Sequence, residues 1–103
     1  MSRSTLFDRL NQELEAFGRK AQSALDEGKL QIELLRVRRK QDQVARDLGL
    51  LVHRRERGGD ADPRRIEGLL FRLDELSGEI ARLEGQLQEA KRQRTESAAA
   101  GSA

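Results

Sequence analysis

Arginine side chains gather in one short stretch, residues 53–65, which reads HRRERGGDADPRR. Guanidinium groups bind phosphate and carboxylate groups through paired hydrogen bonds, so this stretch is a candidate anion-binding site. Its candidate residues are Arg54, Arg55, Arg57, Arg64 and Arg65. Acidic residues are interleaved with them, and no aromatic side chain is present to stack on a base. We therefore favour a solvated surface over an anion-binding tip, and nucleic acid is not a favoured partner.

Other residues that could carry chemistry are sparse. His53 is the single histidine and the chain has no cysteine, so a metal site or a histidine-assisted nucleophile is not expected. Asp74 and Glu75 are adjacent carboxylates, but neighbours on a helix diverge by about 100°. The Gly-Gly pair of the basic stretch lacks the Lys-Ser/Thr pair that follows a phosphate-binding glycine loop. We predict that the protein is not an enzyme and holds no cofactor and no metal.

The composition points to long helices. Of 103 residues, 37% are charged, and the chain has three phenylalanines, no tryptophan and no tyrosine. Such a mixture is typical of coiled coils. No apolar run approaches the ~20 residues that cross a bilayer, and the N-terminus lacks the apolar core of a secretory signal. With no cysteine to form a disulfide, the composition predicts a soluble, cytoplasmic protein.

Charge is distributed unevenly along the chain, although the net charge is only +2. Residues 29–57 carry a net charge of +5, whereas residues 58–103 carry −2. The two segments are therefore complementary, which suits two helices that lie side by side. The densest basic run, residues 36–40, can face acidic residues of the later segment such as Glu79 and Glu84.

Two segments carry the apolar spacing of a coiled coil. After the basic stretch, apolar residues recur at alternating steps of three and four: Ile66, Leu69, Leu73, Leu76, Ile80, Leu83, Leu87 and Ala90. The segment before it takes the same steps: Leu30, Leu34, Val37, Gln41, Val44, Leu48 and Leu51. Steps sustained in this way predict two helices that pack through one face. A polar residue within such a seam, here Gln41, typically fixes the register.

Helix-stop and helix-start residues separate these two segments. Gly58 and the glycine after it can end the first helix in the left-handed conformation. Asp62 is expected to cap the second helix, and the proline after it suits the first helical position. A connection this short makes the helices antiparallel. We predict an all-α fold, an antiparallel two-helix coiled-coil hairpin over residues 29–96 with its bend at residues 57–62.

Residues 1–28 are predicted to form an N-terminal amphipathic helix. Its apolar stripe supplies the candidate partner-binding residues Leu6, Phe7, Leu10, Leu14 and Phe17. At about 100° per residue, this stripe faces almost opposite to the stripe of the first hairpin arm. Either the chain bends near Gly28, or one long helix carries two apolar faces.

The N-terminal helix could also pack on the hairpin as a third helix. Gly78, Ala81 and Gly85 form a small-residue strip beside the main seam that would admit it closely, in cis or from another copy. Packing against protein is favoured over contact with a membrane surface, because its polar face carries mixed charge. The last residues, 97–103, are small and polar and are predicted to be disordered.

Several short motifs follow one another in a characteristic order. They are Phe7-Asp8-Arg9-Leu10, then Lys20-Ala21-Gln22-Ser23-Ala24-Leu25, then Lys29-Leu30 with Ile32, then Leu48-Gly49-Leu50-Leu51. Over residues 6–90 this order resembles a family of small bacterial helical proteins, in which an N-terminal helical hairpin usually precedes a C-terminal zinc ribbon. The resemblance implies a helical hairpin without known enzymatic activity. The family's zinc-ligand cysteine pairs have no counterpart here.

These features together predict a non-enzymatic scaffold or adaptor protein that acts through protein–protein contacts of its amphipathic helices. Its expected partner is another protein or a second copy of this chain. The alternative is an anion-surface binder, in which the basic bend contacts nucleic acid or acidic lipid.

Overall fold

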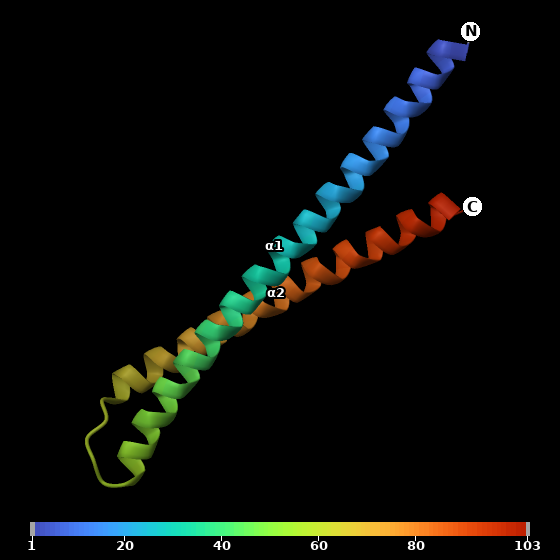
Figure 1. Ribbon diagram of the computed structural model, residues 1–103. Helices are drawn as coiled ribbons and strands as arrows, with labels where there is room; N and C mark the ends of the chain where they lie inside the picture. The colour runs from blue at the N-terminus through green and yellow to red at the C-terminus, as the bar shows by residue number, and fades with distance from the viewer. Residues whose placement is uncertain (1, 103) are drawn as a thin grey trace.

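The computed structural model is a long hairpin of two α-helices (Figure 1). It describes residues 2–102 of the chain, with the side chains of residues 5–100. Helix α1 (Ser2–Glu56) and helix α2 (Pro63–Ser102) are joined by residues 57–62. The molecule measures 86 × 20 × 16 Å, because both helices run nearly along one axis. The all-α helical hairpin predicted from the apolar spacing is confirmed.

A narrow apolar seam holds the two helices together. Val37 of α1 and Leu76 of α2 have no exposed surface. Heptad residues of both helices complete the core around them: Leu30, Leu34, Val44, Ile80, Leu83 and Leu87. Nearer the bend, Leu51 and Ile66 are also buried. Because these residues recur every three or four positions, each helix buries one face and leaves the remaining faces in water.

Two polar contacts cross the middle of the seam and align the helices. Gln41 Nε2 donates to Ser77 Oγ at 3.2 Å, so the one polar heptad residue has a partner on the other helix. Arg38 Nη2 lies 2.7 Å from Glu84 Oε1, which joins the basic run of α1 to α2. Exposed ion pairs contribute only ~0–1 kcal/mol. These contacts therefore favour one alignment, while apolar burial supplies most of the stability.

Helix α1 ends at a glycine in the left-handed conformation. Gly58 has a φ of 84° and is the one described residue with a positive φ. The Gly58 amide donates to the Arg55 carbonyl at 3.1 Å, and the Gly59 amide donates to the Arg54 carbonyl at 2.9 Å. This pair of hydrogen bonds is a Schellman motif, which satisfies carbonyl groups that a helix end otherwise leaves without partners.

Helix α2 begins with a side-chain cap. The backbone amide of Arg64 donates to Asp62 Oδ1 at 3.0 Å, and Pro63 occupies the first helical position. The cap satisfies one of the amides that lack an intrahelical acceptor, and proline has no amide hydrogen to satisfy. The Gly-Gly stop and the Asp-Pro start thus act as their residue types predict.

Replacing Gly58 with alanine is expected to lower the free energy of unfolding by about 1–2 kcal/mol, because a Cβ is unfavourable in the left-handed region. Gly78→Ala is the matched control. Gly78 lies inside α2 with open space around the position of an added Cβ, so alanine should raise stability by about 0.5–1 kcal/mol. Urea denaturation followed by circular dichroism measures both. If both substitutions change the free energy of unfolding in the same direction, Gly58 does not have the left-handed conformation described for the bend.

Helix α1 passes through Gly28 without a break. Of the two alternatives for this region, one long helix with two apolar faces is therefore correct. A glycine costs about 1 kcal/mol in a helix, which is too little to end one that continues on both sides. No third helix is present among residues 2–102, so the N-terminal segment does not complete a three-helix bundle within one chain. In Figure 1 it extends away from the C-terminal end of α2.

The predicted disorder of residues 97–103 is wrong for residues 97–102, which continue α2 as a helix. Three consecutive alanines, residues 98–100, explain the difference. Alanine is the strongest helix former, and adding residues to an existing helix avoids the unfavourable nucleation step. Ala103 lies outside the described residues.

The two helices part at Glu27. Its side chain is buried, and Arg94 Nε of α2 lies 3.4 Å from its Oε1 without forming a hydrogen bond to that oxygen. A buried carboxylate needs such a charged neighbour. Before Glu27, residues 5–26 are exposed apart from the half-buried Ala16. We call residues 5–26 the N-terminal arm.

Candidate interaction surface

An apolar strip runs along the face of α1 that points away from α2. We call it the outer strip, and its members are Leu6, Phe7, Leu10, Leu14, Phe17, Ala21, Ala24, Leu25, Ile32 and Leu35. The exposed fractions of its leucine, isoleucine and phenylalanine side chains lie between 49% and 72%. The strip includes all five predicted partner-binding residues, so the structure brings these five together on one exposed helix face.

The outer strip exists because α1 carries two apolar stripes about half a turn apart. Leu34 and Val37 point toward α2 and are 6% and 0% exposed. Ile32 and Leu35 come from the same turns and are 61% and 51% exposed. A straight helix cannot turn both stripes toward one neighbour. The outer strip therefore stays uncovered within a single chain.

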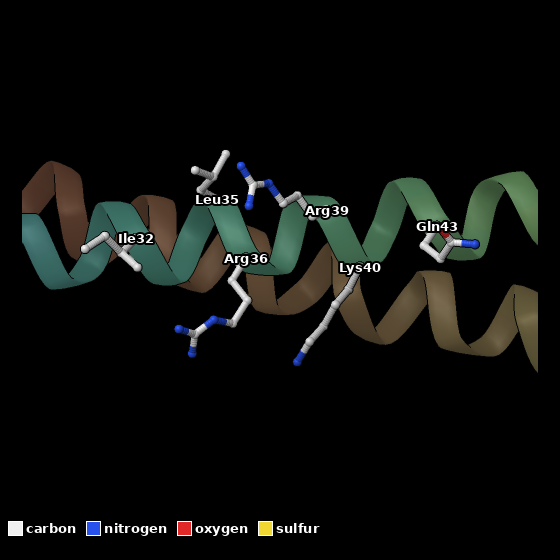
Figure 2. Close-up of a pocket in the computed structure, with 6 residues that line it drawn as sticks. All are labelled: Ile32, Leu35, Arg36, Arg39, Lys40 and Gln43. Carbon is white, nitrogen blue, oxygen red and sulfur yellow. The ribbon is translucent and has the colours of Figure 1, made fainter.

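Figure 2 shows the C-terminal end of the outer strip. Side chains of α1 alone line an open depression there: Ile32, Leu35, Arg36, Arg39, Lys40 and Gln43. Helix α2 supplies no wall to it. Small-molecule sites are concave and bury most of the ligand surface, which one helix face cannot do. The depression instead marks the point where the outer face of α1 changes from apolar to basic.

Charged residues of both signs border the outer strip in the N-terminal arm. Glu13 and Lys20 lie along the same edge of the strip, one heptad apart, and both are exposed. Neither is ion-paired within the part of the chain that the structure describes. Helices that lie on a membrane surface usually carry mostly lysine and arginine beside the apolar face, so this border suits a protein partner better. None of the described helices is apolar over a stretch long enough to cross a bilayer.

The arginines of the bend are all exposed, and they lie in the last turn of α1, in the connection and in the first turn of α2: Arg54, Arg55, Arg57, Arg64 and Arg65. Acidic side chains share this region. Glu56 Oε1 lies 3.5 Å from Arg55 Nε. Asp62 occupies the N-terminus of α2, where helix amides would otherwise attract an anion. The chain's own carboxylates therefore compete with any external anion.

The small residues Gly78, Ala81 and Gly85 are exposed on α2. An added Cβ at Gly78 or Gly85 would meet no neighbouring atom within 4 Å, so no helix packs on them in this structure. Of the two predicted occupants of this strip, the N-terminal helix of the same chain is therefore ruled out, and the N-terminal helix of another copy stays a prediction. The physical reason is that α1 continues straight through Gly28 and carries its N-terminal arm away from α2.

The residues considered for catalysis or metal binding are exposed: His53, Asp74 and Glu75. Among the described residues, no group of three or more histidine, cysteine or acidic side chains could hold a metal ion. A shifted pKa occurs near the end of α2, where a hydrogen bond from Arg92 lowers the pKa of Glu89. Both side chains are exposed and lie three residues apart on one helix, which is typical of a surface ion pair and not of a group in an active-site cleft.

Two features of the surface were not predicted from the sequence. Leu70 and Phe71 are exposed on α2 at 49% and 66%. Their positions outside the heptad seam were the available signal. The burial of Glu27 beside Arg94 has no signal in the sequence, because it depends on where the two helices separate.

Comparison of the chain with protein-family models, with curated proteins and with solved structures finds no match.

Proposed function

We propose that this protein is a non-enzymatic coiled-coil scaffold or adaptor that binds another protein chain through the outer strip. The observation that carries this proposal is the exposure of the strip's large apolar side chains, which reaches 72% at Phe17. Soluble proteins rarely leave contiguous apolar surface open unless it is an interaction site. Because the strip follows one helix face, it suits a partner helix that packs alongside it.

Burial of the outer strip would supply most of the binding free energy. Each fully buried leucine or phenylalanine contributes ~1.5–3 kcal/mol. An exposed ion pair at the rim contributes only ~0–1 kcal/mol. The five predicted partner-binding residues would therefore contribute more binding free energy than the charged border. For a stable complex, this contribution must exceed the free-energy cost of the translational and rotational freedom lost on association.

The predicted resemblance to helical-hairpin proteins without known enzymatic activity agrees with a structural role. We also propose a cytoplasmic location, with which the cysteine-free composition is compatible. Anion binding at the bend is the less favoured alternative, because Glu56 and Asp62 lie among its arginines.

Replacing both Leu14 and Phe17 with serine tests the outer strip. Loss of two apolar side chains that would be buried in the complex should weaken binding to a partner chain, or self-association, by at least about a hundredfold. The change should leave the hairpin folded, because both side chains are exposed in the single chain. Light scattering over a range of concentrations measures self-association. Retention of other proteins on the immobilised full chain measures partner binding.

The matched control is the double change Leu70→Ser with Phe71→Ser. It removes the same two residue types from exposed positions of α2, outside the outer strip. Association should be unchanged in this variant. If the strip variant and the control behave alike in both measurements, the outer strip is not the binding surface and the proposed function fails.

A further inference from the structure

The N-terminal arm carries a second heptad seam that is separate from the hairpin seam. Its residues take alternating steps of three and four: Phe7, Leu10, Leu14, Phe17, Ala21 and Ala24. All six are exposed. A seam of this spacing packs against another helix with the same spacing. Since α2 lies on the opposite face of α1, a helix that covered this seam would have to come from another chain.

We propose that the outer strip is covered by a second copy of this chain, with the two N-terminal arms packed antiparallel over residues 7–24. This inference rests on the proposed function, because it names the occupant of the same strip. A two-fold axis would pass between residues 15 and 16. The interface would then be isologous, with every contact formed twice.

Side-chain size favours this antiparallel alignment. The seam residues have large side chains at the N-terminal end, Phe7 and Leu10, and small side chains at the C-terminal end, Ala21 and Ala24. The proposed alignment sets Phe7 against Ala24 of the second copy and Leu10 against Ala21 of the second copy. Phe7 and Leu10 then each face an alanine, while Leu14 and Phe17 of the two copies face each other at the centre. A parallel pair would place alanine against alanine in two layers and leave them underfilled, which close-packed interfaces avoid.

Charge favours the same alignment. In antiparallel coiled coils, residues along the same edge of the two seams face each other. The proposed alignment therefore sets Glu13 against Lys20 of the second copy, and symmetry forms this ion pair twice. In a parallel pair, Glu13 would instead face Gly18 and Lys20 would face Leu25. Glu13 and Lys20 have no ion-pair partner within the described chain, so both are free to take one from a second copy.

The same charges disfavour the next antiparallel alignment. A shift of one heptad would set Phe17 against Ala21 of the second copy, which also suits their sizes. However, it would place Lys20 against Lys20 of the second copy and Glu13 against Glu27 of the second copy. Like charges at such positions are destabilising, and Glu27 is already buried beside Arg94. Of these two antiparallel alignments, the one centred between residues 15 and 16 is the one in which apolar packing and charge agree.

The proposed pair has a distinctive length. Because the arms overlap and the hairpins point in opposite directions, the distance between the two bends would be roughly 125 Å at 1.5 Å per residue. A parallel pair would stay close to the 86 Å of the single chain. Helix α2 does not obstruct the overlap, since it packs on the face of α1 opposite the outer strip.

Charge reversal in the full-length chain tests the alignment. Glu13→Lys and Lys20→Glu should each weaken dimerisation about tenfold, because each converts two attractive pairs into two repulsive ones. The double variant E13K/K20E should restore the dissociation constant of the parent chain to within about twofold. Sedimentation equilibrium at low salt gives the dissociation constants. Small-angle X-ray scattering gives the maximum dimension, and circular dichroism checks that all variants remain helical.

Each outcome separates this inference from the proposed function. Restoration in the double variant, together with a maximum dimension near 125 Å, supports the antiparallel dimer. A double variant weaker than either single variant, or a dimer no longer than about 90 Å, overturns the alignment. A chain that stays monomeric but binds other proteins in a strip-dependent manner overturns the second-copy inference and leaves the proposed function standing. A parent chain that neither self-associates nor binds other proteins overturns both the second-copy inference and the proposed function.

Discussion

Leu76→Ala is expected to lower the free energy of unfolding by about 2–5 kcal/mol. Leu76 has no exposed surface and lies in the buried cluster with Leu34, Val37 and Leu83. Truncation removes apolar burial and leaves a cavity in a seam only two helices wide. Because only two helices form the seam, few neighbouring side chains can move in to fill that cavity. The whole hairpin therefore loses stability, and its thermal midpoint should fall by about 10 °C or more.

Leu70→Ala is the matched control for that substitution. Leu70 lies six residues earlier on the same helix but is 49% exposed, so its truncation should cost less than about 1 kcal/mol. Urea denaturation followed by circular dichroism compares the two variants at one fixed protein concentration, since association would add to the apparent stability. Similar losses in the two variants would show that Leu76 does not lie in the core that this structure describes.

The N-terminal arm is expected to exchange its amide hydrogens at least about a hundredfold faster than the hairpin core at low protein concentration. The arm has no tertiary contact that covers the outer strip, and it contains Gly18. A helix of this length without tertiary packing opens readily, because most helical stability in proteins comes from burial of an apolar face. Amides of residues 34–51 are protected by the seam instead.

Hydrogen exchange followed by mass spectrometry measures both regions. If the outer strip is covered on association, exchange in residues 8–24 should slow as protein concentration rises, while residues 34–51 stay unchanged. The double change Leu14→Ser with Phe17→Ser should abolish that concentration dependence. Strong protection of the arm at the lowest concentration would contradict a strip left open in the single chain.

Much of the fold follows from features that act over a few residues. The heptad steps from Leu30 and from Ile66 determine which face of each helix is buried, because the helical period is a local property of the backbone. The stop at Gly58 and the cap at Asp62 are equally local, since each depends on hydrogen bonds within one turn of the chain. These features were sufficient to predict the antiparallel hairpin.

Other features depend on competition between distant parts of the chain, and the sequence left them open. From the sequence, the basic run of α1 could pair with any of several acidic residues of α2. The alignment of the two helices determines that Arg38 pairs with Glu84. Glu27 and Arg94 meet because the helices separate at this point. The residues after 96 were predicted to be disordered from composition alone, whereas continuation of an existing helix through Ala98–Ala100 decided their state.

The sequence by itself determined that α1 carries two apolar stripes on opposite faces, because a period of 3.6 residues places Leu34 and Leu35 on different sides of any helix. It did not determine whether the stripe with Phe7 and Phe17 would be covered. Only the tertiary structure decided that, since coverage requires α1 to turn back near Gly28 and pack on α2. The helix instead continues straight, because one glycine costs less than the turns of helix that a bend would break. The outer strip is left exposed for that reason.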